Sequence, residues 1–146
     1  MKSASKKAPK KVVKKLVAEP LYPPDRVAYE NTLGLRMVKR HKDGVTLELP
    51  IRPDILNGNG VMHGGVLASI ADEVAWHAIL HGLGTRDRNM TTSELKINYL
   101  RPIGGKKVVA RGYIVKLGKT LCVTRIDLMD DQRKLGAMAV VTYMLL

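Results

Sequence analysis

The apolar residues of one central segment recur with the period of an α-helix. From Val66 onward they fall at positions 66, 67, 70, 71, 74, 75, 78 and 79. This spacing predicts an amphipathic helix with a wide apolar face that extends to about Leu80. Gly82 and Gly84 follow, and glycine commonly ends a helix. At 1.5 Å per residue such a helix would be roughly 30 Å long, enough to cross a small domain.

Strand-like segments lie on both sides of this helix. Two of them, 35–40 and 45–51, flank a Lys-Asp-Gly turn and predict a hairpin. Four more follow the helix at 90–100, 107–117, 121–129 and 134–145. The helix must bury a broad apolar stripe, so we expect an α+β fold in which a curved antiparallel sheet of about six strands wraps it. We also expect Asp25 to cap a short helix that ends near Asn31.

Charge divides the chain into two parts. The 146 residues carry a formal charge of +12, and residues 1–17 hold seven lysines and no acidic residue. The remaining chain is only moderately basic, at +5. We therefore predict a flexible Lys-rich tail at 1–24 and one domain at 25–146. The tail is either a solvated extension or a segment that contacts polyanions such as nucleic acid or an anionic membrane surface.

Cysteine content and hydropathy limit the cellular setting. Cys122 is the only cysteine, which excludes an intramolecular disulfide and suits a reducing compartment. It falls in a strand pattern, so we expect a buried structural thiol. The chain has no apolar run of membrane-spanning length, and lysines interrupt any signal-peptide core near the start. We expect a cytoplasmic protein without an integral membrane segment.

One carboxylate stands out on the predicted helix. Asp72 falls at the edge of the apolar stripe, close to Ala75 and one turn from Trp76. Ionised carboxylates in such surroundings are costly unless they are paired, so Asp72 is predicted to be either paired or functional. Glu73 falls nearer the polar side and is predicted to be a solvated surface residue.

A glycine-rich loop leads into the helix and supplies hydrogen-bond donors. Glycines at 58, 60, 64 and 65 permit close approach of a ligand to the backbone. The first N–H groups of a helix have no partner within it, so Gly64 and Gly65 would present bare donors. Such donors polarise a carbonyl oxygen, and a nearby carboxylate would complete a site for acyl transfer to water.

Two sequence motifs together resemble a known family. The first is Asn57-x5-His63-Gly64-Gly65-x6-Asp72, and the second is the strand running from Thr91 to Pro102, which ends in Tyr-Leu-Arg-Pro. Residues 28–146 thereby resemble the hotdog-fold acyl-CoA thioesterases of the PaaI-like group. The resemblance implies a hotdog fold and hydrolysis of acyl-CoA to free acid and CoA, with no cofactor beyond the CoA of the substrate. It also implies a homo-oligomer, either a dimer or a dimer of dimers, with the site between subunits.

The same resemblance implies roles for individual residues. Asp72 would attack the thioester or activate the attacking water, and the Gly65 N–H would polarise the carbonyl, with Gly64 beside it. The remaining candidates are polar or charged: His63 and Asn57 would assist at the carbonyl or brace the loop, Thr92 and Ser93 would face the site, and Arg101 and Lys119 would bind the phosphates of CoA.

The sequence also raises two other functions and one metal site, of which the dehydratase and the metal site are disfavoured. A hotdog dehydratase would place its histidine in a different loop, and a non-catalytic acyl-CoA sensor would bind without turnover. His77 and His81 are spaced for a shared metal ion on one helix face. The sequence shows no third ligand, so we expect no metal site.

Overall fold

A computed structural model describes residues 17–86 and 88–146, so most of the predicted tail lies outside the described part of the chain. The elements, in chain order, are β1 (Glu19–Pro20), α1 (Tyr29–Leu33), β2 (Arg36–His41), β3 (Gly44–Pro50), the 3-10 helix η1 (Pro53–Ile55), α2 (Gly64–Leu83), β4 (Met90–Tyr99), β5 (Lys107–Leu117), β6 (Leu121–Met129) and β7 (Leu135–Leu145).

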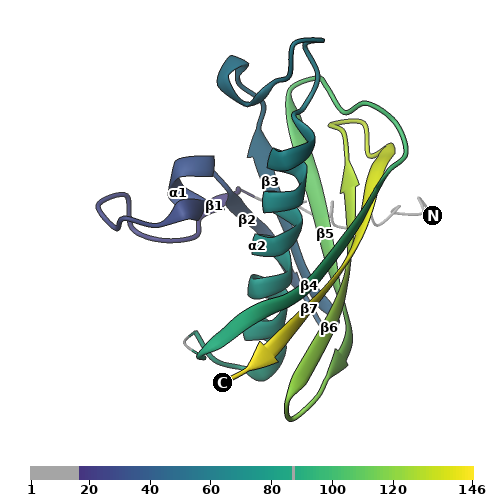
Figure 1. The fold of residues 1–146 in the computed structure, drawn as a ribbon. Coiled ribbons are helices and arrows are strands. Elements are labelled where there is room, and N and C mark those ends of the chain that lie inside the picture. Colours follow the sequence, from purple (N-terminus) through teal and green to yellow (C-terminus); the bar gives the residue numbers. More distant parts are fainter. Residues whose placement is uncertain (1–16, 87) are drawn as a thin grey trace, which may run out of the picture.

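The strands form one antiparallel sheet that curves around the long helix α2 (Figure 1). Its seven strands lie in the order β1-β2-β3-β5-β6-β7-β4, and α2 packs against β3 to β7. This arrangement confirms the predicted α+β fold with a central helix. The seventh strand is the two-residue β1, which pairs with β2 although it precedes residue 25, where we placed the start of the domain.

The core lies between α2 and the inner face of the sheet. The predicted apolar stripe is buried, including Ile70, Val74 and Ile79, and it meets alternate residues of the strands such as Leu47 and Ile126. Cys122 is fully buried, as predicted. Within the described residues, no helix combines the length and the apolar character needed to cross a membrane.

The start of the short helix differs from the prediction. Helix α1 begins at Tyr29 rather than near Asp25, and its N-cap, Ala28, makes no side-chain cap. The reason is a turn just before it, in which the Arg26 N–H donates to the Pro23 carbonyl. The side-chain amide of Asn31 donates to the carbonyls of Pro23 and Arg26, which secures that turn. The prediction that Asp25 caps the helix is therefore wrong.

The last strand of the sheet, β4, is an edge strand. It pairs with β7 on one side only, and most of its residues are exposed. A shift in register interrupts this pairing between Thr92 and Glu94, which marks a β-bulge at Ser93. Bulges often re-aim side chains next to functional sites, so this end of β4 is a candidate functional region.

Helix α2 approaches the sheet closely at Gly112 on β5. A Cβ atom added at this glycine would lie 2.7 Å from Cγ1 of Val74 and 3.4 Å from the Val74 carbonyl oxygen. We predict that Gly112→Ala lowers the free energy of unfolding by about 1–3 kcal/mol through overpacking. Urea denaturation measures the change. In the matched control Gly104→Ala the new methyl group meets no atom within 4 Å, and equal stability of the two variants would contradict this account of the packing.

Candidate active site

Asp72 lies on α2 where the helix passes under the sheet edge formed by β7 and β4. Its Oδ1 atom accepts hydrogen bonds from the Thr92 hydroxyl at 2.9 Å and from the Tyr143 hydroxyl at 2.8 Å. The two donors come from directly paired positions on β4 and β7. Oδ2 has no hydrogen-bond partner among the described residues. The carboxylate is thus held by one oxygen, and the other is available to a ligand or water.

Tyr143 is a site residue that the sequence analysis missed. Burial raises the pKa of its hydroxyl, and the adjacent Asp72 carboxylate raises it further, so the group remains a donor. The ring of Trp76 packs against it edge-on, with centroids 5.8 Å apart. The signal available in the sequence was the alternation that turns Val141 and Tyr143 to the same buried face of the last strand. Only the register of β7 with β4 places that face next to Thr92.

The glycine-rich loop is braced by its own side chains. The Oδ1 atom of Asn57 accepts from the N–H groups of Asn59 at 2.9 Å and Val61 at 3.3 Å. His63 is the N-cap of α2, and its Nδ1 atom accepts from the Gly65 N–H at 3.0 Å. The prediction of a bare Gly65 donor is therefore wrong, because a capping side chain satisfies it. His63 is exposed, so core packing does not block rotation of its ring off this donor.

The start of α2 is fastened to the far end of β4. The Tyr99 hydroxyl donates to the Gly64 carbonyl at 2.7 Å.

Gly65 and Asp72 are seven residues apart on one helix, which corresponds to about 10 Å along the axis. One thioester group cannot touch both of them in a single chain. Donor and carboxylate of the same chain therefore cannot act together on one carbonyl.

The other predicted binding residues do not meet at Asp72. Ser93 donates to the Thr142 carbonyl at 3.2 Å. The Arg101 guanidinium holds the turn between β6 and β7, where it bonds to the Leu135 carbonyl and to the Asp130 carboxylate. Lys119 lies at the tip of the β5–β6 hairpin, beside the Met90 end of β4, whereas Arg101 follows the opposite end of that strand. Within one chain these two cations cannot bind the same nucleotide.

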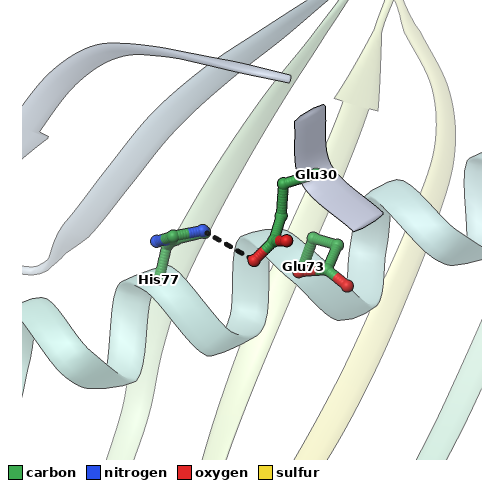
Figure 2. Close-up of side chains that lie close together, drawn as sticks. All are labelled: Glu30, Glu73 and His77. Atoms are coloured by element: carbon green, nitrogen blue, oxygen red, sulfur yellow. Dashed lines mark ion pairs between the residues drawn. The ribbon is translucent and has the colours of Figure 1, made fainter. Parts of the chain in front are cut away.

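A second group of ionisable side chains lies on another face of α2. Glu73 and His77 meet Glu30, which α1 carries over the helix (Figure 2). Burial raises the pKa of Glu73, and the charge of Glu30 adds to this effect. The prediction that Glu73 is a solvated surface residue is therefore wrong, because α1 covers it. Packing of α1 could not be inferred from the period of α2 alone.

A pocket of about 610 Å³ lies between the N-terminal segment and the second half of α2. Its lining includes both helix histidines, His77 and His81, and three arginines, Arg26, Arg40 and Arg86. Asp72 and Thr92 do not line it. The pocket is therefore separate from the Asp72 site, although it reaches the group formed by Glu30, Glu73 and His77 through the His77 ring.

Comparison with known proteins gives consistent matches. A family model described as the thioesterase superfamily matches residues 59–137. The medium/long-chain acyl-CoA thioesterase YigI of Escherichia coli (strain K12) is 27% identical over 131 residues, covering 80% of this chain and 84% of YigI.

Solved structures share the architecture. A Bacillus halodurans protein crystallised with CoA superposes with a TM-score of 0.73 at 26% identity, covering 80% of this chain and 77% of that one. The E. coli PaaI protein from the phenylacetic acid degradation operon superposes with a TM-score of 0.69 at 24% identity, covering 79% of this chain and 86% of PaaI. These matches confirm the hotdog fold expected from the sequence.

The hydrogen bond from Tyr143 to Asp72 should contribute measurably to stability. Tyr143→Phe removes a mostly buried donor to a carboxylate, so we predict a loss of about 1–2 kcal/mol in the free energy of unfolding. The matched control is Tyr113→Phe, which removes a hydroxyl without a hydrogen-bond partner in the described part of the chain and should change stability by less than about 0.5 kcal/mol. Chemical denaturation compares the two variants, and equal losses would show that Asp72 does not depend on this donor.

Proposed function

Since this chain belongs to the thioesterase superfamily, we propose that it hydrolyses acyl-CoA thioesters to a free acid and CoA. The observation that carries the proposal is the Asp72 carboxylate, which Thr92 and Tyr143 fix through Oδ1 and whose Oδ2 has no hydrogen-bond partner among the described residues. Support for CoA as the carrier comes from the relative named as an acyl-CoA thioesterase and from the neighbour crystallised with CoA. No cofactor is needed beyond the CoA that the substrate brings.

In the proposed reaction Asp72 acts on water. Its Oδ2 atom takes a proton as the water oxygen attacks the thioester carbonyl carbon. Backbone N–H groups at the start of α2, Gly65 above all, stabilise the oxyanion after the His63 ring has turned aside. The C–S bond then breaks, and the CoA thiolate takes up a proton. Thr92 and Tyr143 are positioning residues, because they hold the carboxylate and do not touch the reacting carbon.

Direct attack by Asp72 on the thioester is the alternative route. It would form an acyl-enzyme anhydride, which water then hydrolyses. A single turnover in ¹⁸O-labelled water distinguishes the two. The water route puts the label in the product acid and none in Asp72, whereas hydrolysis of the anhydride at the Asp72 carboxyl carbon labels Asp72 and delivers an unlabelled Asp72 oxygen to the acid.

The Gly65 donor and the Asp72 carboxylate lie too far apart in one chain to act on the same carbonyl group, so the proposal includes a second copy of the chain. Donor and carboxylate lie about 10 Å apart along α2, yet both must reach one carbonyl group. The edge strand β4 offers a solution, because its outer side is unpaired and can join a second β4 in an antiparallel pair. A twofold axis between the strands would place the Thr92 end of one beside the Tyr99 end of the other.

In this arrangement, each active site would contain residues from both subunits. Tyr99 is bonded to Gly64, so the Tyr99 end of β4 marks the position of the helix start and its glycine loop. Asp72 is bonded to Thr92, which marks the opposite end. Pairing of the strands would therefore bring Asp72 of one chain to the partner's loop, residues 57–65. We propose a homo-oligomer, at least a dimer, with two such composite sites in each pair.

Asp72→Asn is the direct test of the chemistry. The amide keeps the shape but cannot take a proton, so we predict that kcat falls by about 10² or more while the fold is retained. Thiol release from a panel of acyl-CoA substrates measures turnover, and circular dichroism checks folding. The matched control is Asp25→Asn at an exposed position, which should keep full activity. Near wild-type kcat in folded Asp72→Asn protein would exclude this role for Asp72.

Mixing two inactive variants tests the composite site. Gly65→Pro removes the backbone donor in the first turn of α2, where no intrahelical hydrogen bond is lost, and Asp72→Asn removes the base. Each heterodimer then contains one intact composite site and one doubly mutated site, so we predict recovery of about half the wild-type activity in heterodimers purified through two affinity tags. Homodimers of each variant are the controls. Heterodimers that stay inactive would place the complete site within one chain, and an active monomer in light scattering would do the same.

A further inference from the structure

The group formed by Glu30, Glu73 and His77 has the composition of a metal site. Its three donor atoms, one from each side chain, lie within 4.8 Å of one another. Glu73 and His77 are four residues apart on α2 and so share a face of the helix, while Glu30 reaches them from α1 (Figure 2). The sequence analysis found no third ligand for His77 because Glu30 lies far away along the chain.

The His77 side chain is nearly buried, and its Nε2 atom is without a hydrogen-bond partner among the described residues. The side chains of His77 and Glu30 are only 10% and 12% exposed. The Nε2 atom of His77 has no hydrogen bond within the described part of the chain, although it points toward Glu30. A buried polar atom without a partner is costly and calls for an explanation. The Tyr22 ring, with its centroid 5.9 Å from that of His77, covers the ring on another side.

The distance from His77 to Glu30 suits two ligands of one ion better than a direct bond. Nε2 lies 3.7 Å from Oε1 of Glu30, which is too long for a hydrogen bond. Two ligands of a tetrahedral Zn²⁺, each about 2.0–2.2 Å from the metal, are separated by roughly 3.4 Å. A small movement of the three side chains toward a common centre would complete the coordination, with water in the remaining position.

The charges of the group favour a cation as well. Glu30 and Glu73 bring two acidic side chains into one half-buried space beside the imidazole of His77. A divalent ion would neutralise both and use the free imidazole nitrogen. Two carboxylates and one imidazole suit first-row ions such as Zn²⁺ and Mn²⁺ rather than Mg²⁺ or Ca²⁺, which prefer oxygen ligands alone.

We propose that Glu30, Glu73 and His77 form a three-ligand site for a divalent transition-metal ion, with Zn²⁺ as the preferred occupant. The ion fastens α1, and with it the N-terminal segment, to α2. The site is structural and is independent of the proposed thioester chemistry, since no step at Asp72 passes through it. His81 takes no part, because its Nε2 atom is bonded to the His41 carbonyl at 2.8 Å.

Metal titration of the full-length protein tests the proposal. Protein freed of metal with a chelator is titrated with ZnCl₂, MnCl₂ and MgCl₂ in a calorimeter, and thermal unfolding is followed at each metal concentration. We predict one Zn²⁺ bound per chain and a Tm rise of about 5–10 °C at a hundredfold excess over Kd, with little response to Mg²⁺. Titration with Co²⁺ should give the visible absorption bands of a four- or five-coordinate ion.

Ligand variants decide whether the ion binds at these residues. Glu73→Gln keeps the size of the side chain and is expected to fold, yet it should weaken Zn²⁺ binding by about 10²-fold or more. His77→Gln should do the same and abolish the Co²⁺ bands. The matched control His81→Gln should retain both responses. Absence of Zn²⁺ binding, or equal binding by all variants, would overturn the proposal and leave the two carboxyl groups sharing a proton.

Discussion

Burial of α2 inside the curved sheet is the constraint on which the rest of the structure depends. The helix presents a stripe of small and branched apolar residues, and five strands close over it. It approaches so closely at Gly112 that a Cβ atom there would crowd Val74. Because the helix position is set by this packing, any polar group at the margin of the stripe is held in place with it. Asp72 is such a group.

At the margin of the apolar stripe, packing of the helix positions the side chain proposed to act in catalysis. Asp72 emerges from under the sheet beside the bulge in β4, where Thr92 and Tyr143 bond to one of its oxygens. The same helix carries Glu73 and His77 on a different side, where α1 covers them. Adjacent acidic residues therefore have different surroundings: one is a hydrogen-bonded carboxylate near a sheet edge, and the other lies in a half-buried acidic group.

The distance between the glycine loop and Asp72 within one chain links the fold to the proposed activity. The glycine loop and Asp72 belong to one helix, and its rigidity keeps them about two turns apart. In the proposed dimer, a second copy would bring them together through the unpaired edge of β4. An exposed edge strand is a liability for a monomer, but in the proposed dimer it is the element that assembles the site.

The sequence alone determined the helix, most of the strands and the candidate carboxylate, because these depend on periodicity and on glycine spacing within short segments. It also carried the family resemblance, through the motif from Asn57 to Asp72. Tertiary structure alone decided which partners each side chain has. Tyr143 reaches Asp72 through strand register, His63 occupies the Gly65 donor through cap geometry, and Glu30 meets Glu73 and His77 because α1 folds across α2. Such contacts join residues far apart in the chain or depend on rotamers, and neither is encoded in the period of a local pattern.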